Sequence, residues 1–140
     1  MAEGDGLIYN ILKGKLFQKQ IDMENDTLKL ALVTGYTPDI DTHVGYSDIS
    51  GSELSGTGYT AGGAALANAT VTIDTDNDKA YVDADNVTWA AIDAGTPSHA
   101  ILYSDTATGK PLICYWELTT ATNGGSYTLA FDSGGIIEAA

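Results

Sequence analysis

The sequence predicts a mainly β fold, a single antiparallel β-sandwich or jelly-roll-like barrel, with a short N-terminal helix or arm. Two observations predict this class. Strand-length apolar runs recur along the chain, and clusters of Gly, Asn, Asp, Pro and Thr separate them at intervals of roughly ten residues. No later segment has the helical pattern that parallel strands need for their crossovers. A chain of 140 residues can bury one core, so one β-domain is expected.

Residues 1–26 are predicted to form an arm with an amphipathic helix, ahead of a β-domain over residues 27–140. Apolar side chains recur at helical spacing in the arm, which predicts a helix from Leu7 to Phe17. These side chains are Leu7, Ile8, Ile11, Leu12 and Leu16. The arm is also basic: Gly6 to Gln20 contain three lysines and no acid, whereas residues 30–140 contain two lysines and fourteen acids. This contrast predicts that the arm binds a partner surface rather than its own domain.

The first predicted strand runs from Leu28 to Thr34. Leucines alternate there with Lys29, Ala31 and Val33, the pattern of a strand with one buried face. The later predicted strands are 65–73, 79–83, 87–92, 99–103, 112–118, 126–131 and a short 136–137. Between the first two strands, Gly35 to Gly63 is rich in Gly, Ser and Thr, which predicts a long exposed loop that contacts a partner.

Charge and composition exclude several classes of partner. The net charge is −13, with six lysines, no arginine and nineteen acids, so the chain repels nucleic acids. No apolar run is long enough to cross a bilayer, so neither a membrane nor a nucleic acid is expected as a partner. The first residues lack the basic flank of a secretion signal, and Cys114 lies in an apolar run. We therefore expect synthesis in a cytoplasm, with this thiol in the core.

One acidic segment could hold a cation. Carboxylates alternate along Asp74, Asp76 and Asp78, and Asp85 stands at the last position of a calcium-loop pattern. However, Lys79 occupies the place of the turn glycine, and a Glu is expected where Asp85 stands. Asp and Asn also favour tight turns. The sequence therefore predicts a hairpin turn between two strands and leaves these four aspartates as weak metal candidates.

No motif in the sequence indicates catalysis. His43 and His99 are the only histidines, and neither lies in a nucleophile motif. The glycine-rich run from Gly56 to Gly63 lacks the spacing and the lysine of a phosphate loop, so it predicts a structural bend. Trp89 and Trp116 could form a sugar-binding platform, but their apolar neighbours favour the core. We therefore predict a non-enzymatic protein with no catalytic residue and no cofactor.

A set of segments in a fixed order resembles a known family. They are Lys29-Leu30-Ala31-Leu32-Val33, Tyr36-Thr37-Pro38-Asp39, Asp41-Thr42-His43, the run from Glu53 to Gly63, the run from Asp83 to Trp89, Ala100-Ile101-Leu102-Tyr103, Pro111-Leu112-Ile113 and Gly134-Gly135-Ile136-Ile137. Over nearly the whole chain, this set resembles small virion proteins encoded among the structural genes of tailed bacteriophages. Members of that family are labelled capsid decoration, fibre or tail proteins. The resemblance implies a β-fold and supplies no catalytic residue.

The resemblance and the composition together predict a capsid decoration (cement) protein that stabilises the head. The alternative is a tail or fibre module that binds a host receptor or a glycan. The expected location is the virion, after assembly in the bacterial cytoplasm, and the expected partners are the major capsid protein or, alternatively, tail proteins. A homo-oligomer is also expected, with a trimer favoured.

The arm is the predicted docking element of this virion protein. Its candidate partner-binding residues are Leu7, Ile8, Ile11, Leu12, Lys13, Lys15, Leu16 and Phe17. Removal of residues 1–20 is expected to leave a folded β-domain that no longer joins particles.

Overall fold

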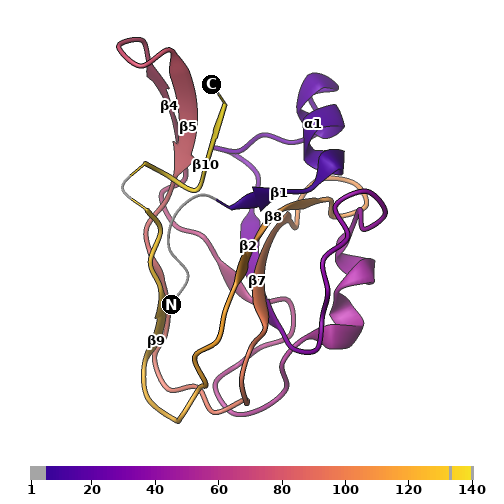
Figure 1. Ribbon diagram of the computed structural model, residues 1–140, viewed down its shortest axis with the longest axis vertical. Coiled ribbons are helices and arrows are strands. Elements are labelled where there is room, and N and C mark those ends of the chain that lie inside the picture. Colours follow the sequence, from indigo (N-terminus) through magenta and orange to yellow (C-terminus); the bar gives the residue numbers. More distant parts are fainter. Residues whose placement is uncertain (1–5, 133, 140) are drawn as a thin grey trace.

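The computed structural model describes residues 6–132 and 134–139. Its largest sheet has five antiparallel strands, which cross the centre of the molecule (Figure 1). In spatial order they are β1 (Leu7–Ile8), β8 (Leu112–Glu117), β7 (His99–Ser104), β2 (Leu28–Val33) and β3 (Ala64–Ala65). The long strands β2, β7 and β8 are the most apolar of the sequence and occupy the middle of the sheet, where both edges of a strand are paired.

Two smaller antiparallel sheets accompany the five-stranded sheet. One contains β10 (Ile137–Ala139), β5 (Lys79–Asp83) and β4 (Thr70–Asp74), in that order, and the other pairs β6 (Val87–Trp89) with β9 (Tyr127–Leu129). The prediction of a mainly β, antiparallel fold is confirmed. The alternative of a barrel is wrong, because the five-stranded sheet ends at two separate edge strands, β1 and β3.

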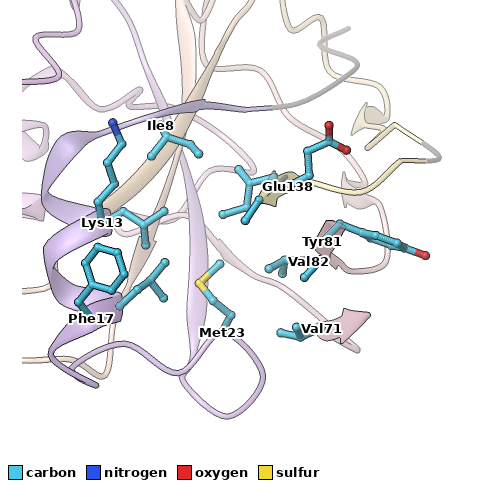
Figure 2. A pocket seen from close by; sticks show the side chains of 13 residues that line it. Ile8, Lys13, Phe17, Met23, Val71, Tyr81, Val82 and Glu138 are labelled. Atoms are coloured by element: carbon cyan, nitrogen blue, oxygen red, sulfur yellow. The ribbon is translucent and has the colours of Figure 1, made fainter. Parts of the chain in front are cut away.

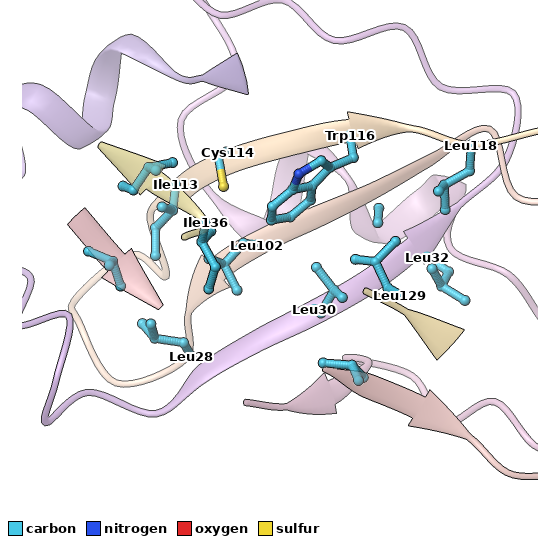
Figure 3. Packing of buried hydrophobic residues seen from close by; sticks show 14 of the residues in the cluster. Leu28, Leu30, Leu32, Leu102, Ile113, Cys114, Trp116, Leu118, Leu129 and Ile136 are labelled. Atoms are coloured by element: carbon cyan, nitrogen blue, oxygen red, sulfur yellow. The ribbon is translucent and has the colours of Figure 1, made fainter. Parts of the chain in front are cut away.

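Buried side chains cover both faces of the five-stranded sheet. On one face Leu30, Leu102 and Trp116 pack with residues of the smaller sheets (Figure 3). On the other face Ala31 and Ile101 pack in a second cluster that includes Tyr9 and Ile49. The prediction that β2 has one exposed face is therefore wrong. Its second face is covered by segments that precede and follow β2 in the chain.

The loop from Gly35 to Gly63 supplies much of that cover. It contains two short 3₁₀ helices, η1 (Tyr46–Asp48) and η2 (Ser50–Ser52), and it buries Tyr36, Ile49 and Leu54. The prediction of an exposed loop is therefore wrong for these residues. The predicted glycine-rich bend is confirmed: a Cβ on Gly63 would lie 2.0 Å from the carbonyl oxygen of Leu30, so only glycine allows this approach.

The N-terminal segment is part of the core rather than a separate arm. Helix α1 spans Asn10–Phe17, shorter than the predicted Leu7–Phe17, because Leu7 and Ile8 pair with β8 instead. Tyr9 and Leu12 are buried at 0% and 1% exposure. The edge of the main sheet offers backbone hydrogen bonds that a longer helix would forgo. Removal of residues 1–20 would therefore expose core side chains.

The predicted strand 65–73 is two strands. Residues 64–65 form β3 on the five-stranded sheet, and residues 70–74 form β4 on the three-stranded sheet. Asn68, between them, has φ of +58°, a left-handed conformation that Asn tolerates and that no regular strand contains. This break carries the chain from one sheet to the other. The other predicted strands are present, with ends shifted by a few residues at most.

Candidate functional site

An apolar groove lies between helix α1 and the three-stranded sheet. It has a volume of about 510 Å³ (Figure 2). The helix side contributes Leu12, Lys13, Leu16 and Phe17, and the sheet side contributes Val71, Val82 and Ile137. Ile8 and Met23 also line the groove. A groove of this size with an almost wholly apolar lining can hold several apolar side chains of a partner.

The register of the three-stranded sheet explains its apolar wall. Val71 lies opposite Val82, and Ile73 lies opposite Ala80. Ile137 pairs with Val82 from the other side. Residues that are directly opposite in a sheet share a face, so these side chains form one apolar face. Exposure on this face increases toward the turn, from 8% at Val82 to 76% at Ile73.

Helix α1 forms the opposite wall. Leu12 anchors the helix to the core, Leu16 is 41% exposed and Phe17 is 90% exposed. Lys13 precedes Phe17 by four residues, so the two side chains are neighbours on the helix surface. Among the described residues, the ion pairs are those of Lys29 and Lys110 with Asp105 and of Lys79 with Glu138. Lys13, the α1 lysine that lines the groove, thus gives this wall a positive charge that no ion pair among the described residues offsets.

The predicted partner-binding residues do not all lie at this groove. Ile8, Leu12, Lys13, Leu16 and Phe17 line it, as expected for a docking helix. Leu7 is exposed elsewhere, Ile11 packs against the second core cluster, and Lys15 is not in the lining.

Sequence reasoning missed the sheet side of the groove. The alternation Thr70-Val71-Thr72-Ile73 was its available signal, since an exposed strand with an apolar face shows this pattern.

The acidic segment forms the predicted turn between β4 and β5. Asp74 accepts hydrogen bonds from the backbone and side-chain nitrogens of Asn77, at 3.2 and 2.8 Å. These bonds hold the pKa of Asp74 below its usual value. Asp85 accepts instead from Asn68, at 2.6 Å. Within the part of the chain that the structure describes, no group of three or more His, Cys, Asp or Glu side chains is placed to hold a metal ion.

The carboxylate of Glu53 accepts hydrogen bonds at both of its oxygens. Glu53 accepts hydrogen bonds from the hydroxyls of Tyr46 and Tyr59 and from the backbone N–H of Gly62. Burial and the bond to Glu53 raise the pKa of Tyr46 to about 12. Because these donors come from one loop, Glu53 holds the loop together.

Tyr9, Tyr36 and His43 form a hydrogen-bonded chain. The hydroxyls of the tyrosines lie 2.9 Å apart, and that of Tyr36 lies 2.7 Å from Nδ1 of His43. The backbone N–H of Asp39 also donates to this Nδ1, at 3.1 Å, so Nδ1 is the acceptor in this arrangement and the Tyr36 hydroxyl is the donor. Burial raises the pKa of Tyr9 and of Tyr36, which keeps both phenols protonated. The chain ties the N-terminal segment to the loop.

The aromatic and sulfur side chains singled out by the sequence are in the core. Trp89 and Trp116 are 7% and 4% exposed, and Cys114 is fully buried. The prediction that they are core residues is confirmed. His99 lies on β7, edge-on to the rings of Tyr36 and Tyr115.

Comparisons of the chain with protein-family models, curated protein sequences and solved structures gave no match. Within the described residues, no helix has the length and apolar character needed to cross a membrane.

Proposed function

We propose that this protein is a non-enzymatic structural component of a bacteriophage virion, a capsid decoration (cement) protein that stabilises the head. It assembles in the host cytoplasm and joins the particle as a homo-oligomer bound to the major capsid protein. We also propose that its sheets form the two layers of a β-sandwich. The core cluster that joins Leu30 and Leu102 to Val82 and Leu129 of the smaller sheets supports that arrangement.

The observation that carries the functional proposal is the apolar surface at the groove. Phe17 and Ile73 are the most exposed large apolar side chains among the described residues, and each lies on one wall of the groove or directly beyond it. Apolar surface gathered in this way marks a site of protein association. The negative charge of the protein disfavours nucleic acid as the partner. The order of segments, which resembles that of phage virion proteins, supports a partner protein within the phage particle.

Copy number and position in purified particles test this proposal. A decoration protein occurs in hundreds of copies on the head, on the order of the number of capsid subunits, because its effect depends on many small interfaces that act together. Quantitative mass spectrometry and a particle image with this chain assigned give both values. A few copies at the tail tip, with saturable binding to cells or a glycan, would support the tail or fibre alternative instead.

A pair of matched variants connects the role to the groove. Phe17→Ser should lower the occupancy of this protein on particles and weaken the resistance of heads to heat. Val44→Ser should change neither property, because Val44 is similarly apolar and 46% exposed but lies outside the groove. Equal occupancy of the two variants on particles would show that the groove does not take part in particle binding.

A further inference from the structure

The groove has two walls of opposite charge. Helix α1 carries Lys13 beside Phe17, and the chain from residue 6 to residue 21 contains no acid. The opposite wall ends in the β4–β5 turn, where Asp74, Asp76 and Asp78 follow the exposed Ile73. Both walls project at the same end of the molecule, on either side of β10 (Figure 1). The surface therefore presents, in order, a basic rim, an apolar groove and an acidic rim.

A surface with this order is complementary to itself under two-fold rotation. When a second copy faces the groove with its walls reversed, each basic rim meets the partner's acidic rim. The same rotation sets Phe17 of each copy near Ile73 of the other. We propose that the occupant of the groove is a second copy of this chain, which closes groove on groove in a two-fold dimer.

The distribution of charge favours a second copy of this chain over an uncharged apolar partner. The body of the protein is strongly acidic, so two copies that meet at random surfaces repel each other. The α1 rim is the place where lysines are concentrated without described ion pairs, and the β4–β5 turn is an acidic segment with exposed apolar residues at its base. The chain thus carries both the site and the segment that fits it.

The position of the walls also selects a two-fold arrangement over the predicted trimer. In a cyclic trimer, each copy uses one surface toward its left neighbour and a different one toward its right neighbour. Here the basic and acidic rims border one groove and face the same way, so a single partner meets both. A two-fold axis through the groove engages all four rims, while a ring would leave one rim of each groove unpaired.

This inference concerns the same groove on which the proposed function rests, but its test needs no particle. The mass of the purified full-length chain is measured by light scattering and sedimentation at micromolar concentration, at about 20 and 300 mM salt. We expect a dimer, favoured at the higher salt because the repulsion between the acidic bodies is screened. A monomer at both salt concentrations, or a trimer, overturns the proposal. A monomeric chain that still decorates particles would assign the groove to the capsid protein.

Two apolar variants locate the interface. Phe17→Ser and Ile73→Ser should each weaken the dimer on the order of a hundredfold, because every dimer loses two symmetry-related contacts. Both side chains are mostly exposed, so both variants should fold, which urea unfolding of the monomer checks. Val44→Ser is the matched control and should remain dimeric. A dimer that survives both groove variants overturns the proposal.

A charge exchange tests the reversed orientation of the walls. Lys13→Glu and Asp76→Lys should each weaken the dimer a few-fold, because each sets like charges against each other. An equal mixture of the two variants should regain the affinity of the natural protein, since the mixed dimer has a Lys–Asp pair at one rim and a Glu–Lys pair at the other. Glu117→Lys is the control, because it makes the same change of charge at a site outside the groove. Its dimer should keep the affinity of the natural protein without any second variant. Failure of the mixture to recover overturns the two-fold arrangement.

Discussion

The five-stranded and three-stranded sheets contain similar apolar residues but differ in their cover. In the first, Ile101 on β7 is fully buried, with packed side chains on both faces of the sheet. In the second, Ile73 on β4 is 76% exposed, on a face that only the groove separates from α1. The difference lies in segments remote in the chain: the N-terminal segment and the 35–63 loop cover the first sheet, and no described segment covers the tip of the second.

This comparison separates residues that stabilise the fold from residues available for association. Apolar area that is already buried contributes to folding, whereas apolar area that is still exposed can contribute only when a partner covers it. Substitutions in the first sheet should therefore change the free energy of unfolding. Equivalent substitutions in the second should change self-association and particle binding.

The largest effect should come from removing the cover of the first sheet. Deletion of residues 1–20 exposes the side chains packed around Tyr9 and Leu12 and removes β1 from its edge. The expected loss is on the order of 5 kcal/mol or more, comparable to the whole stability of a small domain. Near-ultraviolet circular dichroism and urea unfolding measure it. Cooperative unfolding at the midpoint of the full chain would show that the segment is dispensable.

A matched pair of isoleucines tests the comparison directly. Ile101→Ala leaves a cavity in the buried sheet and should cost about 2–5 kcal/mol. Ile73→Ala removes the same atoms from an exposed strand and should cost less than about 1 kcal/mol. Urea unfolding is measured at a concentration too low for self-association. Equal costs would mean that β4 is covered within the monomer.

The loop that covers the first sheet depends on one carboxylate. Glu53→Gln replaces a carboxylate that accepts from three donors by an amide whose NH₂ faces donors, so the free energy of unfolding should fall by about 1–3 kcal/mol. Glu117→Gln, measured above pH 7 where His99 is neutral in both states, is the control, because Glu117 is exposed, and it should change the stability little there. An equal effect of both variants would contradict the role of Glu53 in the loop.

The strands of the core could be predicted because their signals are local. Apolar runs such as Leu112 to Leu118, bounded by turn residues, indicate strands whatever the rest of the chain does. The burial of both faces of β2 could not be predicted in this way. It depends on Tyr9 and Ile49, which come from segments that the sequence pattern assigns to an arm and to an exposed loop.

Half of the candidate site could be predicted for the same reason. The helical spacing of Leu12 and Leu16 is a short local pattern, and it predicts the helix that ends at Phe17. The other wall joins β4, β5 and the C-terminal β10. The hairpin of β4 and β5 is local, but the pairing of Ile137 on β10 with Val82 on β5 joins segments that are far apart in the chain. Local pattern also misplaced the start of α1, because the pairing of Leu7 with Tyr115 depends on the edge of a distant strand.

A smaller effect should appear as pH dependence at His99 in the first sheet. Desolvation lowers the pKa of His99, opposed by the charge of Glu117. Below the unfolded value of about 6.5, the unfolded chain then binds more protons than the folded chain, so stability falls as the pH decreases. His99→Gln should flatten this dependence between about pH 7 and 5, and Glu117→Gln should steepen it. If the stability of all three proteins changed with pH in the same way, His99 would not be the cause of the pH dependence.

The smallest effect is expected from calcium at the β4–β5 turn, at the uncovered end of the second sheet. Asp74 already accepts two hydrogen bonds from Asn77, and Asp85 is bonded to Asn68, so the four aspartates do not converge on one point. Calcium or a chelator should therefore move the melting temperature by less than about 1 °C. A rise above about 5 °C, on the order of 1 kcal/mol or more, would show a cation site.

Asp78→Asn is the variant that makes the calcium test specific. Asp78 has φ of +54°, a left-handed conformation that Asn adopts as readily, so the turn itself should be preserved. The substitution removes one carboxylate and leaves the side chain almost the same size. The melting temperatures of the two proteins should respond equally to calcium, because the turn is held by Asn77 and the backbone rather than by an ion. A calcium response that only the natural protein shows would place Asp78 among the ligands and would give this turn a binding role.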